Sequence, residues 1–174
     1  MRNGPGFFNG LITIAIVTVI LVWMVTTFTN GDALWFLHLL TAEAETVVIY
    51  WDGESYTLYP GDPGFNEIMA TFTDGISHPA GFEWGVAFSE QSISRYHEEW
   101  KLLEVNFAQP VQVHTRHPFA KAKTYLVPLE KTHSYWRRAF SYPGLLPYTS
   151  GPLDLEEERF NRLYEAVERA VQMR

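Results

Sequence analysis

Cysteine is absent from this chain of 174 residues. The protein therefore has no disulfides and no cysteine nucleophile. The motifs H-E-x-x-H, G-x-S-x-G and G-x-G-x-x-G and the P-loop are absent as well, so no recognised reaction signature remains. We expect no catalytic activity, no cofactor and no bound metal.

Positive charge is scarce over the first half of the chain. After Arg2, no lysine or arginine appears before Arg95, whereas residues 30–94 carry ten aspartates and glutamates. The formal net charge is -7. Nucleic-acid binding requires clustered positive charge, so we do not expect nucleic acid as a partner.

Charge of either sign is absent from one long apolar run, residues 11–28, which also lacks proline and glycine. As an α-helix this run would be about 27 Å long, and Phe7, Phe8 and Thr29 would extend it across a hydrocarbon core of about 30 Å. The alternative is a cleaved signal peptide, but its apolar region has about 7 to 15 residues and ends at a small-residue cleavage site, which is missing here. We predict a cytoplasmic N-terminus, residues 1–10, and a transmembrane anchor, residues 11–29.

The charges beside this run predict its orientation. Positively charged flanks stay on the cytoplasmic side, and Arg2 and the amino terminus precede the run, while only acids follow it closely. We therefore expect a single-pass protein of the cell membrane whose C-terminal domain is extracytoplasmic. The lipid bilayer would be its first partner.

Residues 30–45 follow the anchor and are predicted to form an interfacial collar. Asp32 is placed to cap a short helix, and Trp35 and Phe36 fall where aromatic side chains concentrate at a bilayer surface. His38 lies in the same segment. A histidine there can be an axial ligand of haem or of a pigment, although a plain interfacial histidine is far commoner.

The remaining residues, 46–174, are typical of one α+β domain, with two or three helices packed on one side of a mainly antiparallel sheet. Two runs rich in β-branched and aromatic residues flank Asp52-Gly53, a dipeptide that favours a type I′ turn, and predict the first hairpin. A helix should follow, capped by Asp62 and stopped by Gly75.

Strand and helix patterns alternate in the middle of the domain. Residues 82–88 alternate like a strand, and residues 89–103 present a helical apolar face. A hairpin is expected around Glu130-Lys131. Strands are predicted over residues 102–108, 111–115, 121–130 and 132–140.

A loop rich in proline and glycine, residues 141–152, leads into the most regular helical pattern of the chain. Asp154 and Glu157 are spaced as a capping box at its start. The helix has an apolar stripe formed by Phe160, Leu163, Tyr164, Val167 and Val171.

Two histidines lie close together in the stretch HTRHP, residues 114–118. Apolar and polar residues alternate just before it, so a strand would turn His114 to the polar face and His117 to the opposite one. Pro118 also disfavours the helical geometry that would bring the two rings together. We interpret HTRHP as a strand end and not as a metal site.

Positive charge returns over residues 95–138, where eight bases accompany four acids. Opposed charge on two halves of a domain can steer docking on a partner, although ordinary surface charge is the plainer interpretation. If docking occurs, the side chains expected to carry it are Trp35, Phe36, Lys121, Lys123, Arg137 and Arg138.

These patterns favour a non-catalytic accessory subunit, anchored by one helix, that docks its outer domain on a larger membrane protein complex such as one for electron transport. The alternative is a membrane-tethered sensor or regulatory domain that binds a ligand. An anchored hydrolase that uses carboxylates or histidines is the third hypothesis. The sequence does not separate the first two.

Overall fold

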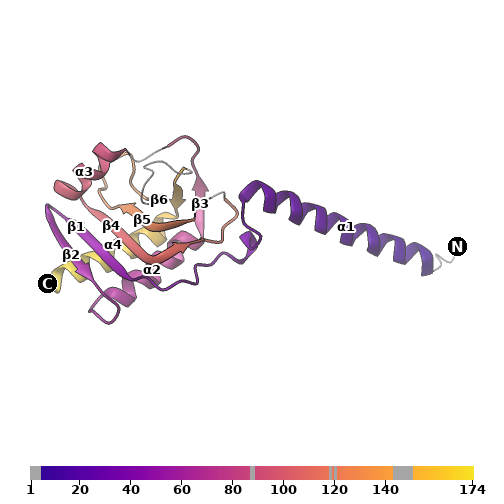
Figure 1. Ribbon diagram of the computed structural model, residues 1–174, viewed down its shortest axis with the longest axis horizontal. Helices are drawn as coiled ribbons and strands as arrows, with labels where there is room; N and C mark the ends of the chain where they lie inside the picture. Colours follow the sequence, from indigo (N-terminus) through magenta and orange to yellow (C-terminus); the bar gives the residue numbers. More distant parts are fainter. Residues whose placement is uncertain (1–4, 87–88, 118, 120, 143–150) are drawn as a thin grey trace.

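A long helix projects from one end of an α+β domain (Figure 1). The computed structural model describes residues 5–86, 89–117, 119, 121–142 and 151–174. Within these residues, the domain consists of a seven-stranded antiparallel sheet and three α-helices. The predicted α+β class with an apolar N-terminal helix is confirmed.

The projecting helix is α1 (Pro5–Asn30), and a single 3-10 turn, η1 (Trp35–Leu37), follows it. The helices of the domain are α2 (Phe65–Ser77), α3 (Glu90–Glu98) and α4 (Glu157–Gln172). Its strands lie in the order β2-β1-β4-β5-β6-β7-β3. Their bounds are β1 (Thr46–Trp51), β2 (Glu54–Leu58), β3 (Pro79–Phe82), β4 (Leu102–Val111), β5 (Ala122–Pro128), β6 (Arg138–Tyr142) and β7 (Leu153–Leu155).

The β1–β2 hairpin forms at Asp52-Gly53, as predicted. Both residues have positive φ, 51° for Asp52 and 87° for Gly53, as a type I′ turn requires. Strand β1 pairs with β4 on its other side. Strand β2 is therefore left at one edge of the sheet.

Strand β4 is longer than predicted and runs through Pro110 to Val111. The prediction of a separate strand over residues 111–115 is wrong. The ladder between β4 and β5 is regular up to Asn106 and resumes only at Val111, opposite Ala122. Pro110 has no N–H to donate, and it is tolerated because it lies in this irregular stretch.

Strand β3 ends at Phe82, where the predicted strand should begin. The chain turns immediately afterwards, at Trp84 and Gly85, and Gly85 has a φ of 74°. The prediction over residues 82–88 is therefore wrong for residues 83–86, and residues 87 and 88 lie outside the described part of the chain.

Strand β7 occupies the residues in which the capping box was expected. Asp154 lies in this strand, paired with Gly81 of β3 and Arg138 of β6, and α4 begins only at Glu157, without a side-chain cap. The capping box is wrong, whereas the helix and its apolar stripe are confirmed, with Phe160, Leu163 and Val167 buried and the other two members partly buried. Most of the predicted loop before it, residues 143–150, lies outside the described residues.

Helix α2 starts and ends later than predicted. Asp62 does not cap it, because the carboxylate accepts the backbone N–H of Tyr59 at 3.0 Å and Gly64 takes the N-cap position. Gly75 does not stop it either. This glycine is buried against Leu155 of β7, where a side chain would meet the sheet.

The β5–β6 pair is antiparallel, as the predicted hairpin requires, with Thr124 opposite Tyr142 and Leu126 opposite Phe140. The connection is longer than a turn at Glu130-Lys131 would give. Residues 132–137 are not in a strand, so the last predicted strand shortens to β6.

Both faces of the sheet are covered, but unequally. Helices α2 and α4 pack together on one face and bury the larger core, with Phe72 and Phe160 among its fully buried side chains. Helix α3, at the upper left of Figure 1, packs on the other face, where Tyr96 meets Leu126 and Phe140. The expectation of helices on one side is wrong for α3. This helix ends at Glu98, because β4 begins four residues later.

Candidate functional site

The junction between α1 and the domain is fastened by one histidine, His114. Its ring Nδ1 donates to both carboxylate oxygens of Asp32, at 3.0 and 3.1 Å. Its backbone N–H donates to the carbonyl of Leu39, at 3.0 Å. His114 therefore holds both ends of a loop, residues 33–38, against the domain. We call this segment the junction loop.

Asp32 has a different role from the predicted helix cap. Its side chain is only 5% exposed, and Oδ1 also accepts the backbone N–H of Leu34 at 2.9 Å. No side chain caps η1, which begins at Trp35. A buried carboxylate needs such donors because it has lost its hydration, so Asp32 and His114 depend on each other.

The junction loop folds back along α1. The indole Nε1 of Trp23 donates to the carbonyl of Ala33 at 3.2 Å, and the rings of Trp35 and Phe36 pack edge to face, 5.9 Å apart. An apolar groove of 380 Å³ separates the loop from the helix. Its lining residues are Thr18, Val19, Val22, Trp23, Trp35 and Phe36. The two predicted collar aromatics thus lie beside the helix rather than beyond its end.

The second histidine of HTRHP has separate neighbours. The ring of His117 stacks on Phe82, with centroids 6.1 Å apart. Burial lowers the pKa of His117, and the nearby Arg116 lowers it further. The two rings of HTRHP face different parts of the protein. Residues 116 and 117 form a bend, so this separation does not come from the strand alternation expected from the sequence.

His38 stacks on His78, with ring centroids 6.1 Å apart and planes 12° from parallel. Both rings border a shallow cleft of 220 Å³ together with Pro79 and Arg116. Among the described residues, no three His, Asp or Glu side chains are grouped so that they could hold a metal ion.

The two arginines predicted to dock a partner are used within the domain. Arg138 donates to Glu83 at 2.7 Å, and Arg137 lies 3.8 Å from Asp154 and 3.7 Å from Glu157. These contacts connect β6 with the turn after β3, with β7 and with the start of α4.

Lys121 and Lys123 lie at the opposite end of the sheet from those arginines. The register of β5 and β6 puts Arg138 level with Pro128, so at about 3.3 Å per residue the lysines are about 17 to 23 Å away along the strand. Both lysines are exposed and have no ion pair with a described residue. The four bases therefore do not form one patch.

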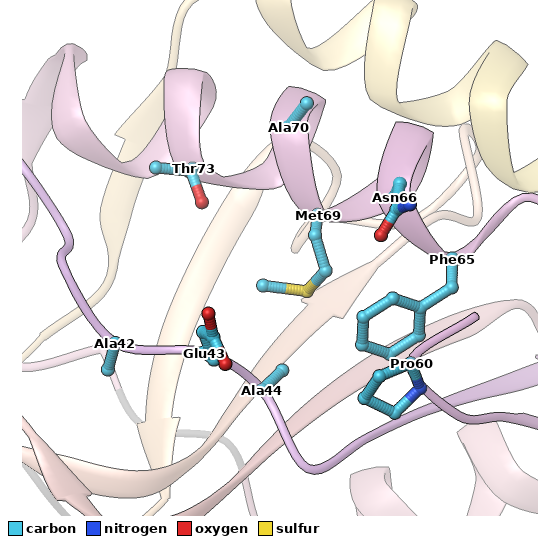
Figure 2. Close-up of a pocket in the computed structure, with 9 residues that line it drawn as sticks. All are labelled: Ala42, Glu43, Ala44, Pro60, Phe65, Asn66, Met69, Ala70 and Thr73. Carbon is cyan, nitrogen blue, oxygen red and sulfur yellow. The ribbon is translucent and has the colours of Figure 1, made fainter.

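A separate cavity, of 460 Å³, lies between the end of the collar and α2 (Figure 2). Figure 2 shows Met69 and Phe65 extending from α2 toward the chain at Ala44 and Pro60. Glu43 brings a carboxylate to the cavity. The size and the mainly apolar lining are typical of a site for a small molecule. Asn66 and Thr73 add further polar groups, and the remaining lining residues are Ala42 and Ala70.

No pattern in the sequence predicted this cavity or the Asp32–His114 pair. The collar and α2 carry no motif that relates them, and the pair is separated by 82 positions. The one available signal is Asp32 itself, an acid directly after an apolar run and before an aromatic pair.

Comparisons with known proteins find no matching family model, no matching curated protein and no matching solved structure. The proposals below therefore depend on α1, the junction and the cavities.

Proposed function

We propose that this chain is a single-pass membrane protein and acts as a non-catalytic accessory subunit, with an extracytoplasmic domain that docks on a larger membrane complex. The observation that carries the proposal is α1. Its segment Phe8–Thr29 is long and apolar enough to cross a bilayer, and the most apolar stretch of this segment is not buried against the described part of the chain. A helix that is apolar on all sides and uncovered by protein needs a lipid environment.

The junction supports a docking role over simple tethering. A flexible linker would be enough to keep a domain near the membrane. Here the His114–Asp32 pair and the bond from Trp23 to Ala33 fix the domain relative to the helix. Binding to a partner in the same membrane costs less ordering entropy when the orientation is fixed beforehand.

The first prediction concerns orientation, with the amino terminus proposed to be cytoplasmic because Arg2 precedes α1. Protease added to right-side-out vesicles should digest the domain and leave a membrane-retained fragment that contains α1. Inside-out vesicles are the matched control and should protect the domain. The reverse pattern would overturn the orientation, and release of intact chain by alkaline carbonate would overturn the anchor.

The second prediction concerns docking through Lys121 and Lys123, because their charges are exposed and not paired within the described chain. Exposed ion pairs contribute about 0.2 to 1 kcal/mol each, so the double change to glutamate should weaken assembly about 2- to 30-fold. Size analysis of mild-detergent extracts would show the 20.0 kDa chain moving from a large complex to the lone-chain position.

The control for that experiment is Lys131→Glu, which reverses an exposed charge whose Nζ lies 4.4 Å from the ring centroid of Tyr164. It should leave the complex intact. Full assembly of the Lys121 and Lys123 double variant at raised salt would rule out these lysines as the docking surface and leave α1 and the collar aromatics as the candidates.

The cavity of Figure 2 supports a second candidate function, a membrane-tethered sensor or regulatory domain that binds a small ligand. Its apolar floor and the carboxylate of Glu43 would suit an apolar ligand with a basic group. A chain that sizes alone in every mild extract, with no associated subunit, would favour this function over the accessory role.

A further inference from the structure

We propose that the tip of the junction loop, residues 34–37, is inserted into the bilayer leaflet on the side of the domain, where it contacts lipid acyl chains beside α1. This inference rests on the proposed membrane anchoring of α1. It assigns a second membrane-embedded element to a protein that otherwise has one.

The tip has the composition of a lipid-facing surface. Leu34, Phe36 and Leu37 are 44%, 48% and 43% exposed, and residues 33–37 include no charged side chain. Exposed apolar side chains gathered in this way mark a surface that contacts membrane or protein. This cluster is continuous with the exposed apolar surface of α1 through the shared groove.

Part of the backbone at the tip and beside it is hydrogen bonded within the chain. Trp23 donates to the carbonyl of Ala33, and the N–H of Leu34 donates to Asp32. The carbonyl of Leu34 accepts the N–H of Leu37 at 2.9 Å. Irregular backbone with unpaired polar groups is excluded from the centre of the hydrocarbon core, so the bonds from Trp23 and to Asp32 lower the cost of placing this loop in the outer part of the leaflet.

The position of the groove along α1 gives the depth. Its helix side extends from Trp23 to Thr18, which at 1.5 Å per residue is about 9 to 17 Å before Thr29. If the whole groove stayed in water, only the helix from Phe8 to about Thr18 would remain in the membrane. That length is about 17 Å, too short for a hydrocarbon core of about 30 Å.

Acyl chains are the favoured occupant of the groove because its walls are almost wholly apolar and open onto the helix surface that faces lipid. A partner helix would contact the same walls, and the experiment separates the two. The base of the loop stays with the domain, since His114 binds Asp32 at one end and Leu39 at the other.

The absence of cysteine allows single spin labels to be placed on the full chain without background. Phe36→Cys and Leu37→Cys report on the tip, and Val19→Cys marks the helix beside it. Tyr59→Cys, at a position 57% exposed, is the control on the domain. The protein is reconstituted alone into phosphatidylcholine vesicles, and collision rates are measured with oxygen and with a water-soluble nickel complex.

Labels at the tip should collide with the nickel complex several-fold less, and with oxygen several-fold more, than the label at Tyr59, and should match the label at Val19. A tip that behaves like Tyr59 while Val19 remains deep would overturn the insertion. If labels at the tip collide with neither reagent, the tip is covered by a second copy of the chain and not by lipid. Aqueous behaviour at Val19 itself would instead refute the anchor, and the insertion with it.

Discussion

In the His114→Ala variant, the backbone amides of the junction loop should exchange hydrogen with solvent about 5 to 150 times faster than in the natural chain. The variant keeps the backbone bond to Leu39 but removes the ring donor from Asp32, whose side chain is only 5% exposed. A buried acceptor left without its partner costs about 1 to 3 kcal/mol, and each 1.4 kcal/mol is about tenfold. The amide of Leu34 is the reporter, because it donates to the same carboxylate.

The matched control is His78→Ala. His78 stacks on His38, and the His78 side chain is 49% exposed. A surface change of this kind should alter stability by no more than about 0.5 kcal/mol. Adding His114→Ala to Asp32→Ala should change little beyond the effect of Asp32→Ala alone, because that change already removes the carboxylate to which both His114 and Leu34 donate. Equal exchange in the His114 and His78 variants would show that the pair does not hold the loop.

Gly64→Ala should lower the free energy of unfolding of the domain by about 2 to 5 kcal/mol. A Cβ at this position would lie 2.8 Å from Cβ of Ala170, so α2 would have to move away from α4. Overpacking of this kind costs about 1 to 3 kcal/mol. The left-handed conformation of Gly64, with φ of 85°, adds about 1 to 2 kcal/mol for any residue with a side chain. Urea titration in detergent micelles, followed by tryptophan fluorescence, measures the loss.

Gly61→Ala separates these two causes. Gly61 also has positive φ, 100°, but no atom lies within 4 Å of a Cβ built there. It should therefore show only the conformational cost of about 1 to 2 kcal/mol. If both variants lose the same free energy of unfolding, the close approach of α2 and α4 is not the reason that position 64 requires glycine.

Local patterns predicted the elements that local forces determine. Residues 11–28 form a helix whose backbone hydrogen bonds are local, and Asp52-Gly53 forms its turn because two adjacent residues there accept positive φ. The apolar stripe of α4 is equally visible in the sequence, since a period of 3.6 repeats over four turns.

The errors fall where distant residues compete for a segment. Strand β7 has three residues, too few to show alternation, and exists because it pairs with both β3 and β6. Because of this pairing, Asp154 lies in a strand and not at the predicted N-cap of α4. In the same way, Asp32 favours a helix cap by itself, and only the folded chain brings His114 to it.

The pairing of early with late segments constrains how the domain is made. Pro79 of β3 pairs with Leu155, and Gly64 lies against Ala170, so neither β3 nor the start of α2 can be covered until the chain has been synthesised through α4. Contacts this far apart in sequence form slowly and leave apolar surface exposed to aggregation in the meantime. Helix α1 emerges first, and with the proposed membrane anchoring a chain held by it would not diffuse away or meet other nascent chains freely. Under that proposal, the nascent domain should depend on chaperones at the membrane for the interval between insertion of α1 and completion of α4.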